Sequence, residues 1–124
     1  MIDMKKEAEI SAAELEVMRV LWESDDAMKV QEICDSLTDS GWKYKTVATL
    51  LMRMEEKGAV VSEKCGKAYY YTPVLDREEY TASQTKSFIK RIYNGSAKEL
   101  AVSLFSGDAL SEEDVEEIRR MFKL

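Results

Sequence analysis

The positions of the apolar residues predict three helices in the first part of the chain. Apolar side chains recur there at intervals of three and four residues, which is the spacing of a helix with one buried face. A capping box from Ser11 to Glu14 begins the first helix, and Gly58 is the glycine expected just past the end of the third. Met28 and Lys29 are expected to form a very short strand. The helices are expected at about residues 12–23, 30–39 and 44–57.

After the third helix, Val60–Val61 and Tyr69–Tyr71 lie on either side of a short turn, which predicts a β-hairpin. Its strands are expected near Val60–Lys64 and Ala68–Thr72, with Cys65–Lys67 as the turn. A short loop around Gly41 joins the second and third helices, as in a helix-turn-helix. Three helices followed by a hairpin is the order of a winged helix-turn-helix, in which the hairpin is the wing.

The chain after Pro73 shows helical periodicity alone. A helix of about 17 residues is expected to begin at residues 76–77. Breaks at residues 94–95 and 107–108 then separate two further amphipathic segments, and Ser111 caps the last of them. This second part of the chain is therefore expected to consist of three short helices.

Three short helices bury too little apolar surface to be stable alone. A second copy of the chain is the simplest partner; the alternative is that the helices fold back on the N-terminal part. We therefore predict a mainly α fold with a small β-hairpin. It combines a winged-helix DNA-binding domain at residues 1–74 with a C-terminal α-helical dimerisation domain at residues 75–124. The dimer interface is expected at Phe88, Ile92, Leu100, Leu104 and Ile118.

The composition is that of a globular, helix-rich protein. Of 124 residues, 45% are apolar and 34% are charged, with one proline and five glycines, which excludes a disordered chain. No run of about 18 apolar residues occurs, so no membrane insertion is expected. Residues 1–9 lack the apolar core of a signal peptide, so the cytoplasm is the expected location.

The sequence lacks the commonest general base and metal ligand. There is no histidine, and two cysteines 31 positions apart make no zinc site. There is also no glycine-rich phosphate loop. We therefore expect no enzyme activity, no cofactor and no metal. Cys34 is expected to be a buried small apolar residue, and Cys65 an incidental thiol, with a redox sensor as the alternative.

The third helix has the charge pattern of a helix that enters a DNA groove. The net charge of the chain is −6, yet residues 43–67 hold six basic against three acidic residues, and no acid occurs from Lys43 to Met54. Basic and hydroxyl side chains lie opposite the apolar stripe, which suits phosphate and base contacts. The alternative is an ordinary solvated helix face. The expected DNA contacts are Lys43, Tyr44, Lys45, Thr46, Thr49 and Arg53, with Lys64 and Lys67 from the wing.

A set of short motifs spread along the chain extends this evidence: Ile10–Met18, Leu21–Trp22, Trp42, Lys45–Val47, Thr49–Leu51, Arg53–Met54, Lys57–Gly58, Tyr69–Tyr71, Ser87–Ile89, Tyr93, Leu110–Ser111 and Glu116–Arg119. With these motifs the chain resembles the penicillinase-repressor and methicillin-resistance-repressor family of winged-helix transcriptional regulators. The resemblance covers nearly the whole chain. It implies a homodimeric repressor of bacterial operons that binds a pseudo-palindromic operator. In that family a membrane-bound β-lactam sensor triggers cleavage of the repressor, which implies a sensor-linked protease as a partner.

The chain departs from the family pattern at several positions. The resistance repressors tend to have proline where this chain has Tyr44 and arginine where it has Ala48, which implies a different operator sequence. Their scissile Asn-Phe pair aligns with Ser103 and Leu104, the candidate cleavage site here. Copper-responsive relatives end in a Cys-x-Cys tail that this chain lacks, so no copper sensing is expected.

The acidic net charge supports an alternative function. A winged helix can serve as a protein-interaction module that does not bind DNA, and a chain with net charge −6 has little general attraction for phosphate. The salt dependence of binding to operator and random DNA distinguishes the two functions.

Overall fold

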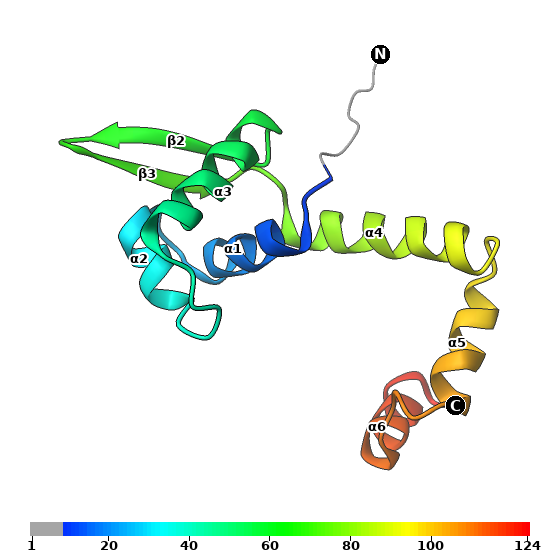
Figure 1. Cartoon of the computed structure of the whole chain (residues 1–124). Coiled ribbons are helices and arrows are strands. Elements are labelled where there is room, and N and C mark those ends of the chain that lie inside the picture. The colour runs from blue at the N-terminus through cyan, green and yellow to red at the C-terminus, as the bar shows by residue number, and fades with distance from the viewer. Residues whose placement is uncertain (1–8) are drawn as a thin grey trace. The chain divides into compact units, whose positions relative to one another are not determined.

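The computed structural model describes residues 9–124 and divides them into two compact units. The N-terminal unit extends to Tyr80, and the C-terminal unit spans Thr81–Leu124. Residues 1–8, in which no signal peptide is expected, lie outside the described residues. Figure 1 labels the helices and strands along the chain.

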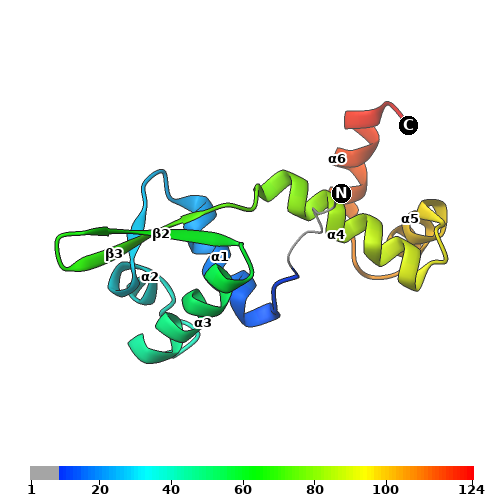
Figure 2. The same cartoon turned by 90° about the horizontal axis from the view of Figure 1, so that it is seen from above.

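The N-terminal unit contains the three helices and the hairpin that the apolar pattern predicts. Strand β3 lies in the middle of an antiparallel sheet with the order β1-β3-β2. The hairpin of β2 and β3 projects beyond the helices of this unit (Figure 1, Figure 2). The expected short strand β1 is confirmed and pairs with β3. In chain order the elements are α1 (Ala12–Glu23), β1 (Met28–Lys29), α2 (Val30–Ser36), α3 (Tyr44–Glu56), β2 (Val60–Cys65) and β3 (Ala68–Pro73).

The core of this unit lies between α1, α2, α3 and the base of the hairpin. Its fully buried side chains come from the apolar stripe of each helix and from the start of β2; they include Val17, Met18, Leu21, Ile33, Val47, Leu51, Met54 and Val60. The capping box at the start of α1 is confirmed: Ser11 Oγ accepts the Glu14 amide at 3.1 Å, and Glu14 Oε1 accepts the Ser11 amide at 2.8 Å.

Gly58 ends α3 as expected. Its φ is +83°, a left-handed conformation that favours glycine. The Gly58 amide donates to the carbonyl of Glu55 at 3.0 Å, and the Ala59 amide donates to the carbonyl of Met54 at 2.8 Å. These two bonds form a Schellman motif, which satisfies the last helical carbonyls and turns the chain directly into β2.

Two predicted boundaries are wrong. Helix α2 ends at Ser36 rather than near Asp39, because Leu37 adopts a non-helical φ of −104° and ψ of 47°. The Ser40 hydroxyl donates to the Leu37 carbonyl at 2.8 Å and stabilises the turn that replaces the last helical residues. The hairpin turn consists of Gly66 and Lys67 alone, because Cys65 still pairs with Ala68.

The start of helix α4 (Arg77–Ile92) belongs to the N-terminal unit. Trp22 donates its indole N–H to the carbonyl of Leu75 at 2.9 Å, and the Arg77 guanidinium lies 5.7 Å from the centroid of the Trp22 ring. Tyr80 is buried, and its hydroxyl accepts the Ile10 amide at 3.3 Å. The first turn of α4 is thus fixed to α1 and to the segment that precedes α1.

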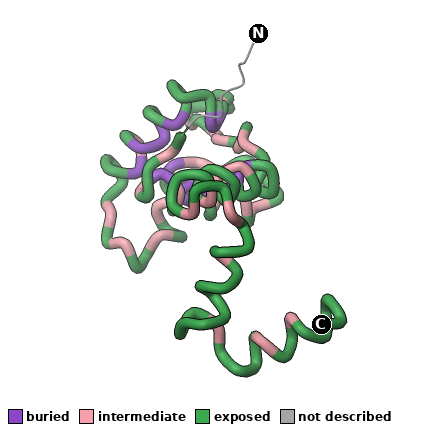
Figure 3. The backbone as a smooth tube through the Cα atoms, turned by 90° about the vertical axis from the view of Figure 1, so that its right-hand side faces the viewer, coloured by how far each residue is buried: buried purple, intermediate pink, exposed green. Residues whose placement is uncertain are grey.

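The C-terminal unit has no buried side chain of its own. It contains the rest of α4 together with α5 (Ala97–Ser106) and α6 (Glu112–Phe122), and no residue from Thr81 to Leu124 is buried. In Figure 3 this unit has only the colours of exposed residues (green) and half-buried residues (pink), and none of the purple of buried residues. Large apolar side chains are therefore exposed in this unit: Phe88, Ile92, Val102, Leu104, Phe105, Met121, Phe122 and Leu124.

Candidate DNA-binding surface

The exposed face of α3 is the centre of the candidate site. Four side chains bury the opposite face in the core, at the spacing the sequence predicts: Val47, Leu50, Leu51 and Met54. The side chains of Lys45, Thr46, Thr49 and Arg53 are all exposed. Together with Leu50 they line one shallow groove of about 360 Å³. The structure therefore brings four of the predicted contact residues onto one surface.

The polar groups of this groove are available to an incoming ligand. Thr49 Oγ1 donates to the carbonyl of Lys45 at 2.9 Å, so the oxygen lone pairs and the methyl group of Thr49 are left for contacts. Within residues 9–124, Lys45 and Arg53 form no ion pair. Arg53 can therefore offer its guanidinium to two acceptors at once, as on a guanine edge.

The N-terminus of α3 also faces solvent. Lys43 is the cap residue, and no side chain accepts the first helical amides. Tyr44 follows with 52% of its surface exposed. Free amides and the positive end of the helix dipole favour a phosphate at this position. Lys43, Tyr44 and Lys45 are thus placed as the sequence predicts, at the end of the helix where an anion is stabilised.

The wing carries the remaining two predicted contacts. Lys64 and Lys67 are exposed at its far end, on either side of Gly66, whose φ of +68° forms the tight turn. The Lys64 ammonium lies 5.8 Å from the centroid of the Tyr69 ring, which is itself 51% exposed. Both lysines are therefore separate from the α3 groove and lie on a second element of the same unit.

The first and the last of the three adjacent tyrosines of β3 have different environments. Tyr71 packs against the core, whereas Tyr69 is exposed on the wing. Burial, and after it the charge of the Glu55 carboxylate, raises the pKa of Tyr71 above its ordinary value of 10.0. The Tyr71 phenol is therefore protonated at neutral pH and contributes no charge to the surface.

Sequence patterns do not reveal two contacts that fix α3. Lys57 Nζ lies 2.6 Å from Glu14 Oε1 and also donates to the Glu9 carbonyl at 3.0 Å. Burial raises the pKa of Glu14, but Lys57 and the Ser11 amide lower it by more, so the net pKa lies below the ordinary value of 4.5. The second contact joins the Glu55 carboxylate to Ser62 on β2, through the Ser62 amide at 3.3 Å and hydroxyl at 2.8 Å.

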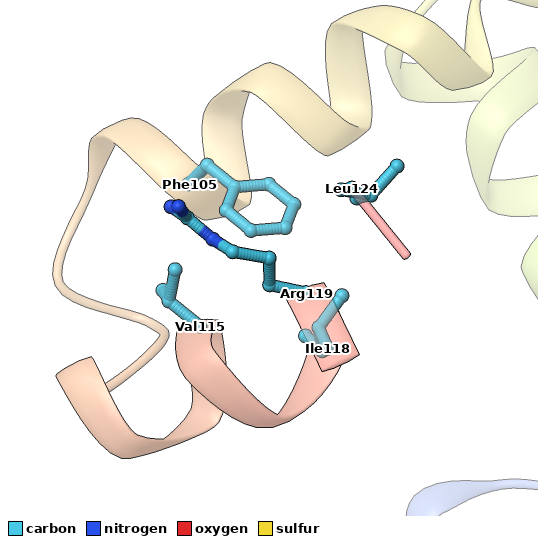
Figure 4. Close-up of a pocket in the computed structure, with 5 residues that line it drawn as sticks. All are labelled: Phe105, Val115, Ile118, Arg119 and Leu124. Carbon is cyan, nitrogen blue, oxygen red and sulfur yellow. The ribbon is translucent and has the colours of Figure 1, made fainter. Parts of the chain in front are cut away.

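The residues predicted for the dimer interface all lie in the C-terminal unit. Phe88, Ile92 and Leu104 are exposed, and Leu100 and Ile118 are half-buried. Ile118 lines an apolar cleft of about 340 Å³ between α5 and α6, and Figure 4 shows the side chains that line it. The cleft is lined by Phe105, Val115, Ile118, Arg119 and Leu124.

The remaining predictions concern cleavage, metals, membranes and cysteines. Ser103 and Leu104, the candidate cleavage pair, are exposed within α5. The described part of the chain has no group of three or more His, Cys, Asp or Glu residues that could hold a metal ion. None of its helices is both long and apolar enough to cross a bilayer. Cys34 is half-buried against the core, with its sulfur 3.5 Å from the Trp42 carbonyl oxygen, and Cys65 is exposed.

Comparison with known proteins gives the family. Residues 10–123 match the family described as penicillinase repressor. The chain belongs to this family. It is 35% identical to the penicillinase repressor of Bacillus licheniformis, over 97% of this chain and 94% of that protein. It is 29% identical to the methicillin resistance regulatory protein MecI of Staphylococcus aureus strain N315, over 94% of each chain. The resemblance inferred from the motifs is confirmed.

Solved structures of the repressor BlaI match part of this chain. One is the solution structure of the DNA-binding domain of the repressor BlaI, with 40% identity and a TM-score of 0.53 over 62% of this chain and 94% of that domain. Another is the monomeric form of Bacillus licheniformis BlaI in complex with the blaP half-operator, with 40% identity and a TM-score of 0.51 over the same shares. The predicted mainly α fold with a small hairpin is confirmed.

Proposed function

We propose that this member of the penicillinase-repressor family is a sequence-specific DNA-binding repressor that acts as a homodimer on a pseudo-palindromic operator. The observation that carries the proposal is the exposed face of α3, which has no acid from Lys43 to Met54, together with the wing lysines, in a chain that matches BlaI in its half-operator complex at 40% identity over 62% of this chain. A repressor with this role acts in the bacterial cytoplasm, where the DNA lies.

Each part of the surface has a distinct role in the proposal. Thr46, Thr49 and Arg53 contact base edges in the major groove, because they line one groove on α3. The helix N-terminus and the two wing lysines contact phosphates, which position the helix but carry no sequence information. Two copies place their α3 helices about one helical turn of DNA apart, on the two halves of the operator.

The exposed apolar surface of the C-terminal unit supports dimerisation through this unit. No residue from 81 to 124 is buried in the single chain, and side chains as large as Phe88, Ile92 and Leu104 are exposed. Burial of such side chains contributes about 1.5–3 kcal/mol each, so a second copy has a strong driving force to cover them. Linking two DNA-binding units multiplies operator affinity by roughly 10²–10⁴.

Relief of repression by a sensor-linked protease, in response to a β-lactam, is the regulatory part of the proposal. The Ser103–Leu104 bond is exposed but lies inside α5. Proteases bind extended chains, so α5 must unwind locally before a cut. Cleavage there would remove Leu104, Phe105 and all of α6 from the dimer interface, and the linked pair of DNA-binding units would separate.

The experiment that tests the proposal compares binding to selected and scrambled DNA. The unaltered chain is used to enrich duplexes from a randomised pool, and affinity for the enriched duplex is measured against a scrambled duplex of the same composition. A triple alanine variant of Lys43, Lys45 and Arg53 should lose most of the binding. No enrichment by the unaltered chain would instead support a protein-interaction module, and unchanged binding by the variant would remove α3 from the proposal.

A further inference from the structure

The last turn of α3 is joined to the first wing strand by one carboxylate. Glu55 Oε2 accepts the Ser62 hydroxyl at 2.8 Å and the Ser62 amide at 3.3 Å. Hydrogen bonds to an ionised acceptor are stronger than those between neutral groups. This pair therefore links the helix that carries the α3 groove directly to the hairpin that carries Lys64 and Lys67.

Ser62 is the point at which the hairpin leaves the core. Val60 is buried, and Ser62 and its ladder partner Tyr71 are half-buried, whereas residues 63–67 are all exposed. Gly66 lies four residues after Ser62, a reach of roughly 13 Å along an extended chain. A tilt of about 15° at Ser62 therefore moves the tip by roughly 3 Å, which is the length of a hydrogen bond.

The position of Glu55 is otherwise unfavourable. A carboxylate in the last turn of a helix lies at the negative end of the helix dipole. Glu55 is also the first acid after the acid-free stretch from Lys43 to Met54, on the helix proposed to enter a phosphate-lined groove. The contact with Ser62 offsets these two electrostatic costs.

We propose that Glu55 is a positioning residue that holds the wing at a fixed angle to α3, so that the wing lysines contact phosphates while α3 contacts bases. The inference rests on the proposed DNA binding. It assigns to one acid a role in DNA affinity opposite to the repulsion expected from its charge.

The first test uses three variants that each remove one negative charge. E55A removes the acceptor, E55Q keeps an oxygen acceptor for Ser62, and E56A removes the exposed neighbouring acid, which makes no side-chain hydrogen bond to any residue from 9 to 124. On the enriched duplex, E55A should bind roughly three- to tenfold more weakly, and the slope of log affinity against log salt should flatten by about one to two. E55Q and E56A should bind at least as tightly as the unaltered chain, with its slope.

The ratio of affinity for enriched over scrambled duplex should be similar in E55A and the unaltered chain, because the α3 groove is intact. Glu55 is exposed and alanine favours helix, so E55A should also remain folded. Equal affinity and slope in E55A and E56A would overturn the inference. A loss in E55Q as large as that in E55A would overturn it too, because glutamine retains the acceptor.

The second test measures the wing without DNA. A fluorophore on the exposed Cys65, in a Cys34→Ala background, reports the rotation of the wing tip through time-resolved anisotropy. The label should rotate more freely in E55A than in E55Q or E56A, and equal rotation in all three would overturn the inference. If the unaltered chain enriches no duplex, the proposed function fails on its own, while this measurement still decides whether Glu55 holds the hairpin.

Discussion

The Lys57 ammonium lies 2.6 Å from the Glu14 carboxylate, and this ion pair joins the end of α3 to the start of α1. Glu14 is only 2% exposed. Its carboxylate also accepts the Ser11 amide, so one acid both caps α1 and fixes the C-terminal end of the helix that bears the candidate DNA-contact residues. The N-terminal end of that helix is left open to solvent.

Replacement of Lys57 by methionine should destabilise the chain by about 1–3 kcal/mol, because Glu14 is left buried without its partner. The pKa of Glu14 is lowered in the folded chain, so the pair contributes stability above the ordinary pKa of 4.5, and that stability is lost as pH falls through the lowered pKa. K57M should therefore lose less stability on acidification than the unaltered chain.

Urea unfolding at neutral pH and below pH 4.5 measures both the stability that K57M loses and how that stability depends on pH. R19M is the matched control, because Arg19 is exposed on α1 and makes no ion pair with residues 9–124. Equal unfolding free energies for K57M and R19M would show that the Lys57–Glu14 pair contributes nothing to stability.

Arg53→Ala should reduce affinity for the enriched duplex by about 1–3 kcal/mol and relax base preference at one position of each half-site. The reason is that the Arg53 guanidinium forms no ion pair within residues 9–124 and can bind two acceptors of one base. Competition assays against single-base variants of the duplex measure the effect. A uniform loss across all variants would place Arg53 on a phosphate instead.

Lys67→Ala should weaken binding to enriched and scrambled duplexes alike. Lys67 is exposed at the wing turn, where a phosphate contact carries no sequence information. The slope of log affinity against log salt should flatten by about one. Titrations at several salt concentrations test this, and an unchanged slope would mean that the wing tip does not touch the DNA backbone.

Ile92→Asp should convert the proposed dimer to a monomer. Ile92 is 56% exposed in the single chain, so an acid there costs little in the isolated chain but becomes buried in the proposed interface. Analytical sedimentation at micromolar concentrations separates the two states, and Lys90→Asp on the same helix is the control. A monomeric unaltered chain would contradict the proposed dimer itself.

A chain that ends at Ser103 should fail to dimerise and should lose roughly 10²–10⁴ in operator affinity. This truncation removes α6 and the end of α5, and with them Leu104, Phe105 and Ile118. Binding to a single half-site should be unaffected, because the N-terminal unit is complete. Full operator affinity in the truncated chain would exclude cleavage at this position as the switch.

Local patterns predict most of the N-terminal unit, because each helix carries its own buried stripe and its own terminal signals. Ser11 and Gly58 mark the start of α1 and the end of α3 correctly. The predicted end of α2 is wrong because Leu37 continues the apolar spacing but has a non-helical backbone conformation. Periodicity reports which side chains can face the core, and it does not detect the turn that Ser40 stabilises.

The exposed groove of α3 is predictable for the same reason, since the face opposite a buried stripe is defined by the stripe. The contacts around the groove are not predictable from the sequence. Glu14 has the pattern of a surface capping residue, and only the packing of α1 on α3 brings Lys57 to it. The Glu55–Ser62 contact depends on how the hairpin leaves the helix. The bond from Thr49 to Lys45 is local, and its spacing of four residues is a signal that sequence analysis could use.

Helix α4 begins inside the N-terminal unit, which has a consequence for chimaeras between members of this family. A joint at Pro73 would separate Trp22 and Ile10 from their hydrogen-bond partners at Leu75 and Tyr80. A joint after Tyr80 keeps these contacts and exchanges the C-terminal unit whole. The segment that can be exchanged without damage therefore begins one turn inside a helix rather than at a loop.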